Sequence, residues 1–454
     1  MKKKVVFIFF AALFRIAAWS QPSQQPAPAE QDELIVNARA MVSALALGDF
    51  AAAVKDFDET MLKLSSSDKL AAFWKETPVR FGEFKRQTAA RRVREEPYDV
   101  VLVTCEFVKV TLDAKVVFDK DKRIAGFFFV PSLPPAEPKL PAYADRALFE
   151  ETEVTIGGPD WPLAALLTLP KGAGPFPGLV LVHGSGPNDR DETIGPNKPF
   201  RDLAWGLASR GIAVLRYDKR TRAYGTKLMA DPKLMASLTV REETIDDGLS
   251  GLALLRATPK IAKDKVFILG HSLGGMLMPR IAFAPGADNA AGFIIMAGLT
   301  RALEDTYVQQ MTYLFGLDGS LSDDDKTKLD EIKAQAARIK ALTEADTGKD
   351  ERFLNAAPRY WLDLRDYRPA EAVKKVSRPL LILQGSRDYQ VTTVDFENWK
   401  TALAGRNDVA FKLYPKLNHL FIEGKGVPTP AEYTQMAGNV ALYVIEDIAA
   451  WIKR

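Results

Sequence analysis

The chain has 454 residues, of which 47% are apolar and 26% charged, so we expect two or three units that each bury a core. This composition excludes collagen, a disordered chain and a disulfide scaffold. The single cysteine, Cys105, cannot form an intrachain disulfide, and the alternating pattern around it predicts a strand with a buried, inert thiol.

The first twenty residues have the order of a secretory signal peptide. Three lysines precede an apolar run over 5–14, and the small residues Ala18 and Ser20 follow. An uncleaved anchor is the alternative, but this run is too short for a bilayer, which needs about 20 residues. We therefore expect export to the periplasm or the medium, and no stable membrane insertion after cleavage of residues 1–20. That cleavage changes the formal charge from +3 to −1, unlike the basic surface of a nucleic-acid binder.

A small α+β domain is predicted over residues 33–130. Before it, the Pro- and Gln-rich segment 21–32 predicts a flexible tether. Apolar residues recur at helical spacing over 33–47, 50–64 and 68–76. Strand-like alternation then follows over 82–93, 99–112 and 114–130. Five prolines within 131–143 predict a linker to the next domain.

Residues 144–454 alternate short apolar runs with helical segments. Such runs, joined by helices, are typical of a parallel sheet covered on both faces. The strands are expected over 178–184, 211–218, 265–271, 292–298 and 379–385, with helices over 200–210 and 244–258. From about residue 299 to 376 the sequence is helical and charged, and we predict that this insertion forms a lid over the carboxyl ends of the strands. A solvated peripheral hairpin is the alternative.

The sequence GHSLGG, over 270–275, lies between a predicted strand and a predicted helix. This is the context of the G-x-S-x-G nucleophile elbow, a sharp turn that exposes its serine. Gly270 and Gly274 allow the close approach that flanking side chains would prevent. We therefore predict that Ser272 is a catalytic nucleophile.

A serine nucleophile needs a base, and the chain has three histidines. His183 opens the segment HGSGP and His271 lies inside the elbow, so His419, C-terminal to the serine, is the base by elimination. The acid that orients it should follow the strand after the lid, which selects Asp388. Asp395 is a weaker candidate because we expect it on the following helix.

Two backbone N–H groups should stabilise the oxyanion of an acyl transfer. One is that of Leu273, directly after the nucleophile. The second is expected from the HGSGP loop, where Ser185 N–H is preferred and Gly186 stays open. For the charged segments 188–191 and 216–220 we expect structural Asp–Arg pairing or substrate contacts, and no catalytic role.

The motifs VLVHGSGPNDRDE, YDKR, GHSLGG, QGSRDYQV and LNHLF occur in this order. They resemble the α/β-hydrolases of the dienelactone-hydrolase-like and bacterial carboxylesterase branch, over about residues 145–454. The loop after YDKR departs from that pattern, with TRAYG in place of a tighter glycine-rich turn. The N-terminal unit resembles the cystatin- or NTF2-like DUF3887 module.

The resemblance implies an α/β-hydrolase fold and hydrolysis of small to medium carboxylic esters through an acyl-enzyme, without a cofactor. The residues agree, because the sequence has no phosphate-binding glycine loop and no histidine or cysteine cluster for a metal. A peptidase or thioesterase with the same triad is the alternative, and a non-catalytic binding protein is a weaker one. The expected partner is a small-molecule ester, and a homodimer is left open. Substitutions at Tyr360, Trp361 and Leu364 should alter acyl preference if the insertion is a lid.

Overall fold

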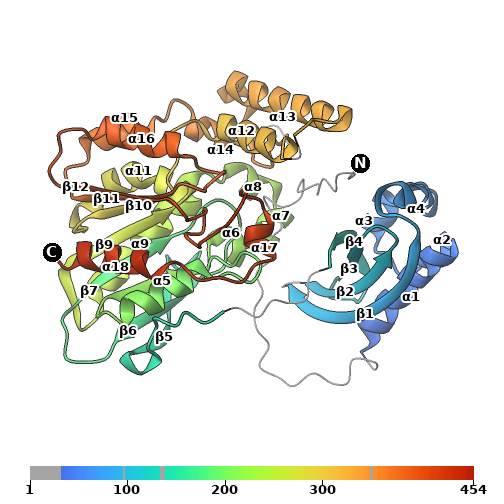
Figure 1. Ribbon diagram of the computed structural model, residues 1–454, viewed down its shortest axis with the longest axis horizontal. Coiled ribbons are helices and arrows are strands. Elements are labelled where there is room, and N and C mark those ends of the chain that lie inside the picture. The colour runs from blue at the N-terminus through green and yellow to red at the C-terminus, as the bar shows by residue number, and fades with distance from the viewer. Residues whose placement is uncertain (1–31, 96–97, 133–138, 318, 348–350) are drawn as a thin grey trace. The chain divides into compact units, whose positions relative to one another are not determined.

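The computed structural model describes residues 32–95, 98–132, 139–317, 319–347 and 351–454 (Figure 1). The predicted signal peptide lies outside the described residues, as does all of the predicted tether except Asp32. The chain divides into two compact units between residues 136 and 137, within the proline-rich segment.

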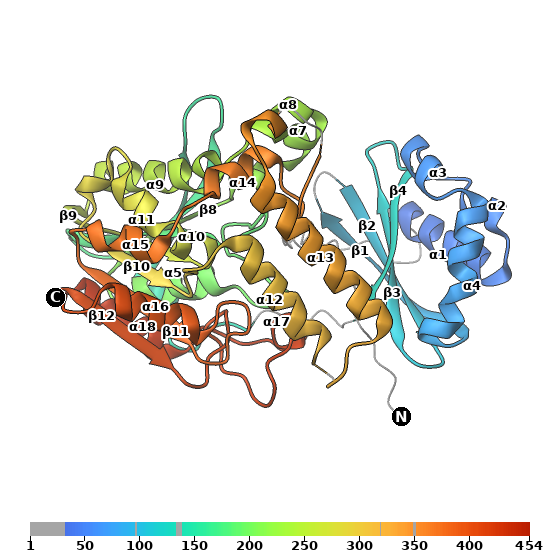
Figure 2. The same cartoon turned by 90° about the horizontal axis from the view of Figure 1, so that it is seen from above.

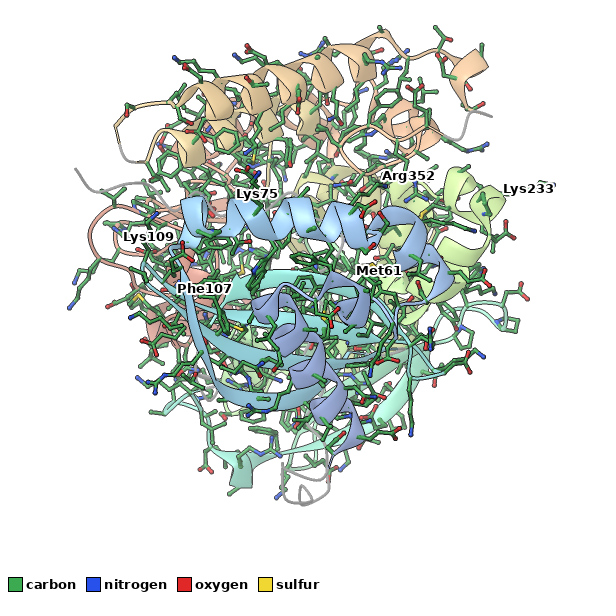
Figure 3. All side chains as sticks on the ribbon, turned by 90° about the vertical axis from the view of Figure 1, so that its right-hand side faces the viewer. Met61, Lys75, Phe107, Lys109, Lys233 and Arg352 are labelled. Atoms are coloured by element: carbon green, nitrogen blue, oxygen red, sulfur yellow. The ribbon has the colours of Figure 1, made fainter. Side chains whose placement is uncertain are left out.

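The N-terminal unit packs helices on one curved antiparallel sheet of order β1-β2-β3-β4. Its elements are α1 (Glu33–Leu47), α2 (Phe50–Ala53), α3 (Glu59–Leu64), α4 (Ser67–Phe81), β1 (Phe84–Glu95), β2 (Tyr98–Phe107), β3 (Thr111–Phe118) and β4 (Ile124–Pro131). Helix α1 begins at the Asp32 cap and buries one apolar face against β2 and β3. Cys105 of β2 lies in this core, where burial raises the pKa of its thiol to about 12. Figure 3 looks onto these helices, with Lys75 on α4 and Phe107 at the end of β2.

Three of the stretches expected in this unit are wrong in their bounds. The alternation over 99–112 runs through a turn closed by the hydrogen bond from Phe107 N to Val110 O at 2.9 Å. The alternation over 114–130 runs through a second turn, where the Asp119 carboxylate accepts from the N–H groups of Asp121 and Arg123. The expected helix over 50–64 is two short helices, α2 and α3. A period of two continues across a tight hairpin, so alternation alone does not reveal the reversal.

The second unit contains an eight-stranded sheet of order β12-β11-β10-β9-β7-β8-β6-β5. Its strands are β5 (Phe149–Ile156), β6 (Leu163–Pro170), β7 (Phe176–Val182), β8 (Ala213–Tyr217), β9 (Ile261–His271), β10 (Phe293–Met296), β11 (Leu380–Gly385) and β12 (Val409–Tyr414). The strands from β12 to β8 pair in parallel, whereas β5 and β6 form an antiparallel edge. The expected mostly parallel sheet is therefore confirmed, with two further strands at its start.

Helices cover both faces of this sheet (Figure 2). On one face, α5 (Pro199–Ala208) and α18 (Leu442–Ile452) share an apolar cluster with the strands. On the other face, a second cluster includes side chains of α9 (Asp246–Ala257), α11 (Met278–Phe283) and α16 (Thr393–Ala402). Short helices occupy the connections: α6 (Arg220–Ala223), α7 (Gly225–Ala230), α8 (Pro232–Ser237), α10 (Leu273–Met276) and α17 (Ala431–Thr434).

The long segment between β10 and β11 is helical, as expected. It contains α12 (Leu303–Phe315), α13 (Asp323–Ala341), α14 (Pro358–Leu364) and α15 (Pro369–Ala372), and α12 and α13 lie side by side (Figure 2). A capping box between Ser322 and Asp325 begins α13. Over the described residues, no helix combines the length and apolar character that crossing a bilayer requires.

Candidate active site

Ser272 occupies a sharp turn between β9 and α10. Its backbone has φ 53° and ψ −113°, a strained conformation for a residue with a side chain. A Cβ at Gly274 would come within 2.6 Å of the Val182 carbonyl oxygen, and one at Gly270 would overlap the Gly274 backbone. The two glycines of the motif are therefore required by close backbone contact, as the sequence indicated.

Asp388 and His419 lie in the loops that follow β11 and β12, and the fold brings them together. Their Oδ2 and Nδ1 atoms are 2.6 Å apart, and the Asp388 side chain has no exposed surface. The other oxygen, Oδ1, accepts from the backbone N–H groups of Gln390 and Val391 at 2.8 and 2.9 Å. A carboxylate oxygen can only accept a hydrogen bond, so the His419 nitrogen that faces it must be the donor. The arrangement therefore holds His419 with a proton on Nδ1.

The His419 loop also contacts the turn that holds Ser272. His271, directly before Ser272, donates from Nε2 to the His419 carbonyl oxygen at 3.0 Å, and the two rings are 4.6 Å apart. Among the described residues no hydrogen bond joins Ser272 to His419 itself. Such bonds are often long before substrate binds, so this geometry is compatible with a nucleophile and its base.

Glu192 lies beneath this turn, although the sequence analysis did not single it out. Its Oε2 is 2.8 Å from His271 Nδ1, and its Oε1 accepts from the Gly184 N–H at 2.7 Å. Burial opposes a charged imidazole, but the adjacent Glu192 carboxylate raises the pKa of His271 above its usual value. His183 behaves in the opposite way, because burial lowers its pKa to about 4. The two histidines differ because His271 lies directly against the Glu192 carboxylate, whereas burial and the nearby Lys219 charge outweigh the attraction of Glu192 at His183. No local motif encodes this difference.

The candidate oxyanion donors lie on two segments beside Ser272. Leu273 begins α10, so its N–H has no partner within that helix. In the HGSGP loop the Gly184 N–H is occupied by Glu192, which leaves Ser185 and Gly186 as the candidates that the sequence analysis named. The side chain of Asn188 closes this loop by donating to the carbonyl oxygens of Gly184 and Ser185.

The charged residues beside the site form ion pairs with one another. Asp218 pairs with Arg190 at 3.1 Å, and Arg220 pairs with Asp247 at 2.6 Å. Arg216, directly before the YDKR motif, contacts the carboxylates of Asp191 and Glu151. These contacts are the structural Asp–Arg pairing that we expected.

Asp395, the weaker candidate for the acid, lies on α16 as predicted. Its carboxylate accepts from Arg301 at 2.6 Å and from Thr300, and is fully buried among them. The structure therefore brings Asp388, and not Asp395, to the histidine.

An apolar cluster lies against α10, the helix that follows Ser272. It contains Leu364 and Tyr360 of α14 together with Val240, Leu273, Met276, Leu277, Leu299 and Val391. Trp361 points elsewhere, because its Nε1 donates to the Phe353 carbonyl within the insertion. Two of the three insertion residues that the sequence selected thus reach the neighbourhood of Ser272.

In the part of the chain that the structure describes, no group of three or more His, Cys, Asp or Glu side chains is arranged to hold a metal.

Comparisons with known proteins identify both units. A family model described as "Alpha/beta hydrolase family" matches residues 179–432, and one described as "Protein of unknown function (DUF3887)" matches residues 38–127. Esterase EstD of Thermotoga maritima is 38% identical over 387 residues, which cover 85% of this chain and 87% of that protein. This alignment is longer than the second unit, so it extends into the first.

Solved structures are more distant. An esterase of Pyrococcus furiosus has a TM-score of 0.42 at 14% identity, covering 67% of this chain and 91% of that chain. Est1E of Butyrivibrio proteoclasticus has a TM-score of 0.42 at 15% identity, covering 66% of this chain and 99% of that chain. The family model and the 38% identical relative confirm both expected resemblances. The chain therefore belongs to the alpha/beta hydrolase family, as a hydrolase of the carboxylesterase type with a DUF3887 domain on its N-terminal side.

Proposed function

We propose that this protein hydrolyses carboxylic esters of small to medium size through an acyl-enzyme on Ser272. The observation that carries the proposal is the strained backbone of Ser272 beside the buried Asp388–His419 pair. A serine is held in such a conformation only where the surrounding structure enforces it, and such strain clusters at active sites. The esterase activity named for the Thermotoga maritima relative supports the same chemistry.

In the proposed mechanism His419 Nε2 takes the proton of Ser272 as Oγ attacks the ester carbonyl. Asp388 keeps the other imidazole proton on Nδ1 and stabilises the imidazolium that forms. The N–H of Leu273 and one N–H of the HGSGP loop donate to the oxyanion. His419 then protonates the leaving alcohol, and the same residues activate water to release the acid from the acyl-enzyme.

The acyl group would lie against the apolar cluster beside α10, and the helical insertion would act as a lid. Leu364 and Tyr360 support this placement, since both belong to the insertion and to that cluster. The apolar side chains of this cluster suit the hydrocarbon part of an ester.

Turnover of p-nitrophenyl esters from acetate to palmitate tests the proposal, with wild-type protein beside Ser272→Ala. Ser250→Ala is a matched control, because its hydroxyl only donates to the Asp246 carbonyl within α9. We expect short-chain turnover that Ser272→Ala abolishes and Ser250→Ala retains. Turnover that survives in Ser272→Ala would contradict the assignment, and Ser272-dependent cleavage of amides but not esters would indicate a peptidase.

We further propose that the chain is exported after cleavage of residues 1–20, with 33–130 as a separate domain and 131–143 as its linker. Lys2–Lys4 and the apolar run after them support export, and the DUF3887 match over 38–127 supports the domain. Expression in a bacterial host, followed by cell fractionation and mass measurement of the intact protein, tests both cleavage and location. A cytosolic product that keeps residues 1–20 would contradict export.

A further inference from the structure

Lys219 has a buried ammonium that the proposed triad does not use. Only 1% of its side chain is exposed, and lysines are almost never buried so completely unless they are paired. Its Nζ donates to the Gly184 carbonyl oxygen at 2.8 Å and lies 3.0 Å from Glu243 Oε1. Burying this charge is costly, so its contacts point to a specific task.

The carbonyl that Lys219 holds belongs to the peptide bond between Gly184 and Ser185. This bond is trans, so its C=O and its N–H point in opposite directions. The carbonyl oxygen accepts from the buried ammonium at 2.8 Å and more weakly from Asn188 Nδ2 at 3.3 Å, so the Ser185 N–H is directed away from both donors. Gly184 lies directly beside the nucleophile, since a Cβ there would be 3.0 Å from the Ser272 Cβ.

We propose that Lys219 is a positioning residue that orients the Ser185 N–H as the second oxyanion donor. The proposal rests on the function proposed above and resolves the choice that the sequence left open between Ser185 and Gly186. The ammonium also polarises the peptide, because hydrogen bonds in series strengthen one another in a low-dielectric interior. The N–H therefore becomes a better donor to the charge that develops on the substrate.

The helical insertion reaches Lys219 through Glu243. Tyr360 of α14 donates its hydroxyl to Glu243 Oε2 at 2.9 Å, while Oε1 pairs with the lysine. Burial first, and then the Glu243 carboxylate, raises the pKa of Tyr360 well above its usual value, so its hydroxyl remains a donor. A continuous series of polar contacts thus connects α14 to the Gly184 carbonyl. Correct seating of the insertion should favour the oriented oxyanion loop.

The test is the double variant Lys219→Met with Glu243→Gln, which removes both charges and leaves no buried ion unpaired. Because the misoriented donor weakens only the transition state, we expect kcat to fall about tenfold to a hundredfold with KM nearly unchanged. The affinity for a trifluoromethyl ketone, which forms an oxyanion on the serine, should fall by the same factor. Rates are expressed per active site, titrated with a fluorophosphonate, so that misfolded protein does not count.

Tyr360→Phe keeps the proposal testable if the double variant does not fold. We expect a smaller fall in kcat in the same direction, about threefold to tenfold, as the outer contact is lost. Tyr313→Phe is the matched control, because it removes a phenol hydrogen bond of the same insertion, to the Pro428 carbonyl at 2.8 Å. It should leave kcat unchanged.

The outcomes separate this proposal from the proposed function. If Ser272→Ala is inactive but the double variant keeps wild-type kcat and ketone affinity per titrated site, the role of Lys219 is refuted and the triad stands. Equal rates for Tyr360→Phe and Tyr313→Phe refute the connection to the insertion. If Ser272→Ala remains active, the proposed function fails and the role of Lys219 fails with it.

Discussion

Replacing Asp388 by asparagine should abolish turnover without unfolding the protein. The substitution preserves the shape of the side chain and changes one oxygen to a donor. Oδ1 accepts from the N–H groups of Gln390 and Val391, which only an oxygen can satisfy. The amide nitrogen should therefore face His419 Nδ1, at the position that is 2.6 Å away in the wild type. It replaces an oxygen that also accepts from Gln384 Nε2 at 3.2 Å, but Gln384 keeps its bonds to the Gly385 and Val391 carbonyls. An NH2 group there forces Nδ1 to accept, and the imidazole proton moves to Nε2.

That tautomer cannot accept the proton of Ser272, which sets the size of the effect. A serine hydrolase with its histidine in the wrong tautomer loses about 10⁴ in kcat, or about 5 kcal/mol of transition-state stabilisation. Turning the amide round would place its NH2 against two backbone donors, and each buried donor left unsatisfied costs about 1–3 kcal/mol. The reversed rotamer therefore offers no escape. We expect kcat for p-nitrophenyl butyrate at pH 8 to fall about 10⁴-fold, with the thermal midpoint within a few degrees of the wild type.

Asp395→Asn is the matched control. That carboxylate is equally buried but pairs with Arg301 and Thr300, so its loss should lower the free energy of unfolding and leave kcat per folded molecule within a few fold. The assay is a comparison of kcat and of urea unfolding for both variants. The reasoning is refuted if Asp388→Asn keeps more than about a tenth of wild-type kcat, or if only Asp395→Asn loses activity.

Three further predictions concern the elbow, the buried histidine and the acyl site. Gly274→Ala should cost at least about 2 kcal/mol of folding free energy and most of the activity, because its Cβ would meet backbone oxygen at 2.6 Å. Gly158→Ala, with open space around its Cβ, should be neutral by urea unfolding, and equal midpoints would contradict the argument. The pKa of His183, about 4 when folded against 6.5, favours the neutral ring. His183 therefore contributes about 3 kcal/mol to the free energy of unfolding above pH 6.5, and this contribution is lost as the pH falls towards 4. Urea midpoints of His183→Gln should therefore fall less steeply over that range, and curves parallel to the wild type would rule this out. Leu364→Ala should raise kcat/KM for octanoate relative to butyrate by enlarging the apolar cluster, whereas Leu362→Ala, outside that cluster, should not. Identical chain-length profiles for the two variants would count against an acyl site there.

The sequence alone determined the features that are local along the chain. Strand, GHSLGG and helix follow one another directly, and the elbow conformation of Ser272 depends on that succession and on its glycines. The parallel sheet followed from apolar runs separated by helices, and only its antiparallel edge was missed. His419 was selected by elimination among three histidines, and the fold brings it to Asp388 across thirty-one residues. Their catalytic roles stay predictions until the variants are measured.

Tertiary structure decided which charged groups are buried together. Glu192 meets His271, and Tyr360 meets Glu243 across 117 residues, although nothing near any of them in the chain marks it as buried. Lys219 lies in a run of charged residues that is typical of a solvated loop. A buried charge needs an opposite charge or hydrogen-bonding partners, and for Glu192 and Lys219 the charged partner belongs to a segment that only the fold brings close. Local patterns therefore singled out Ser272 and the elbow around it, whereas the packing of distant loops decided which residues surround that turn.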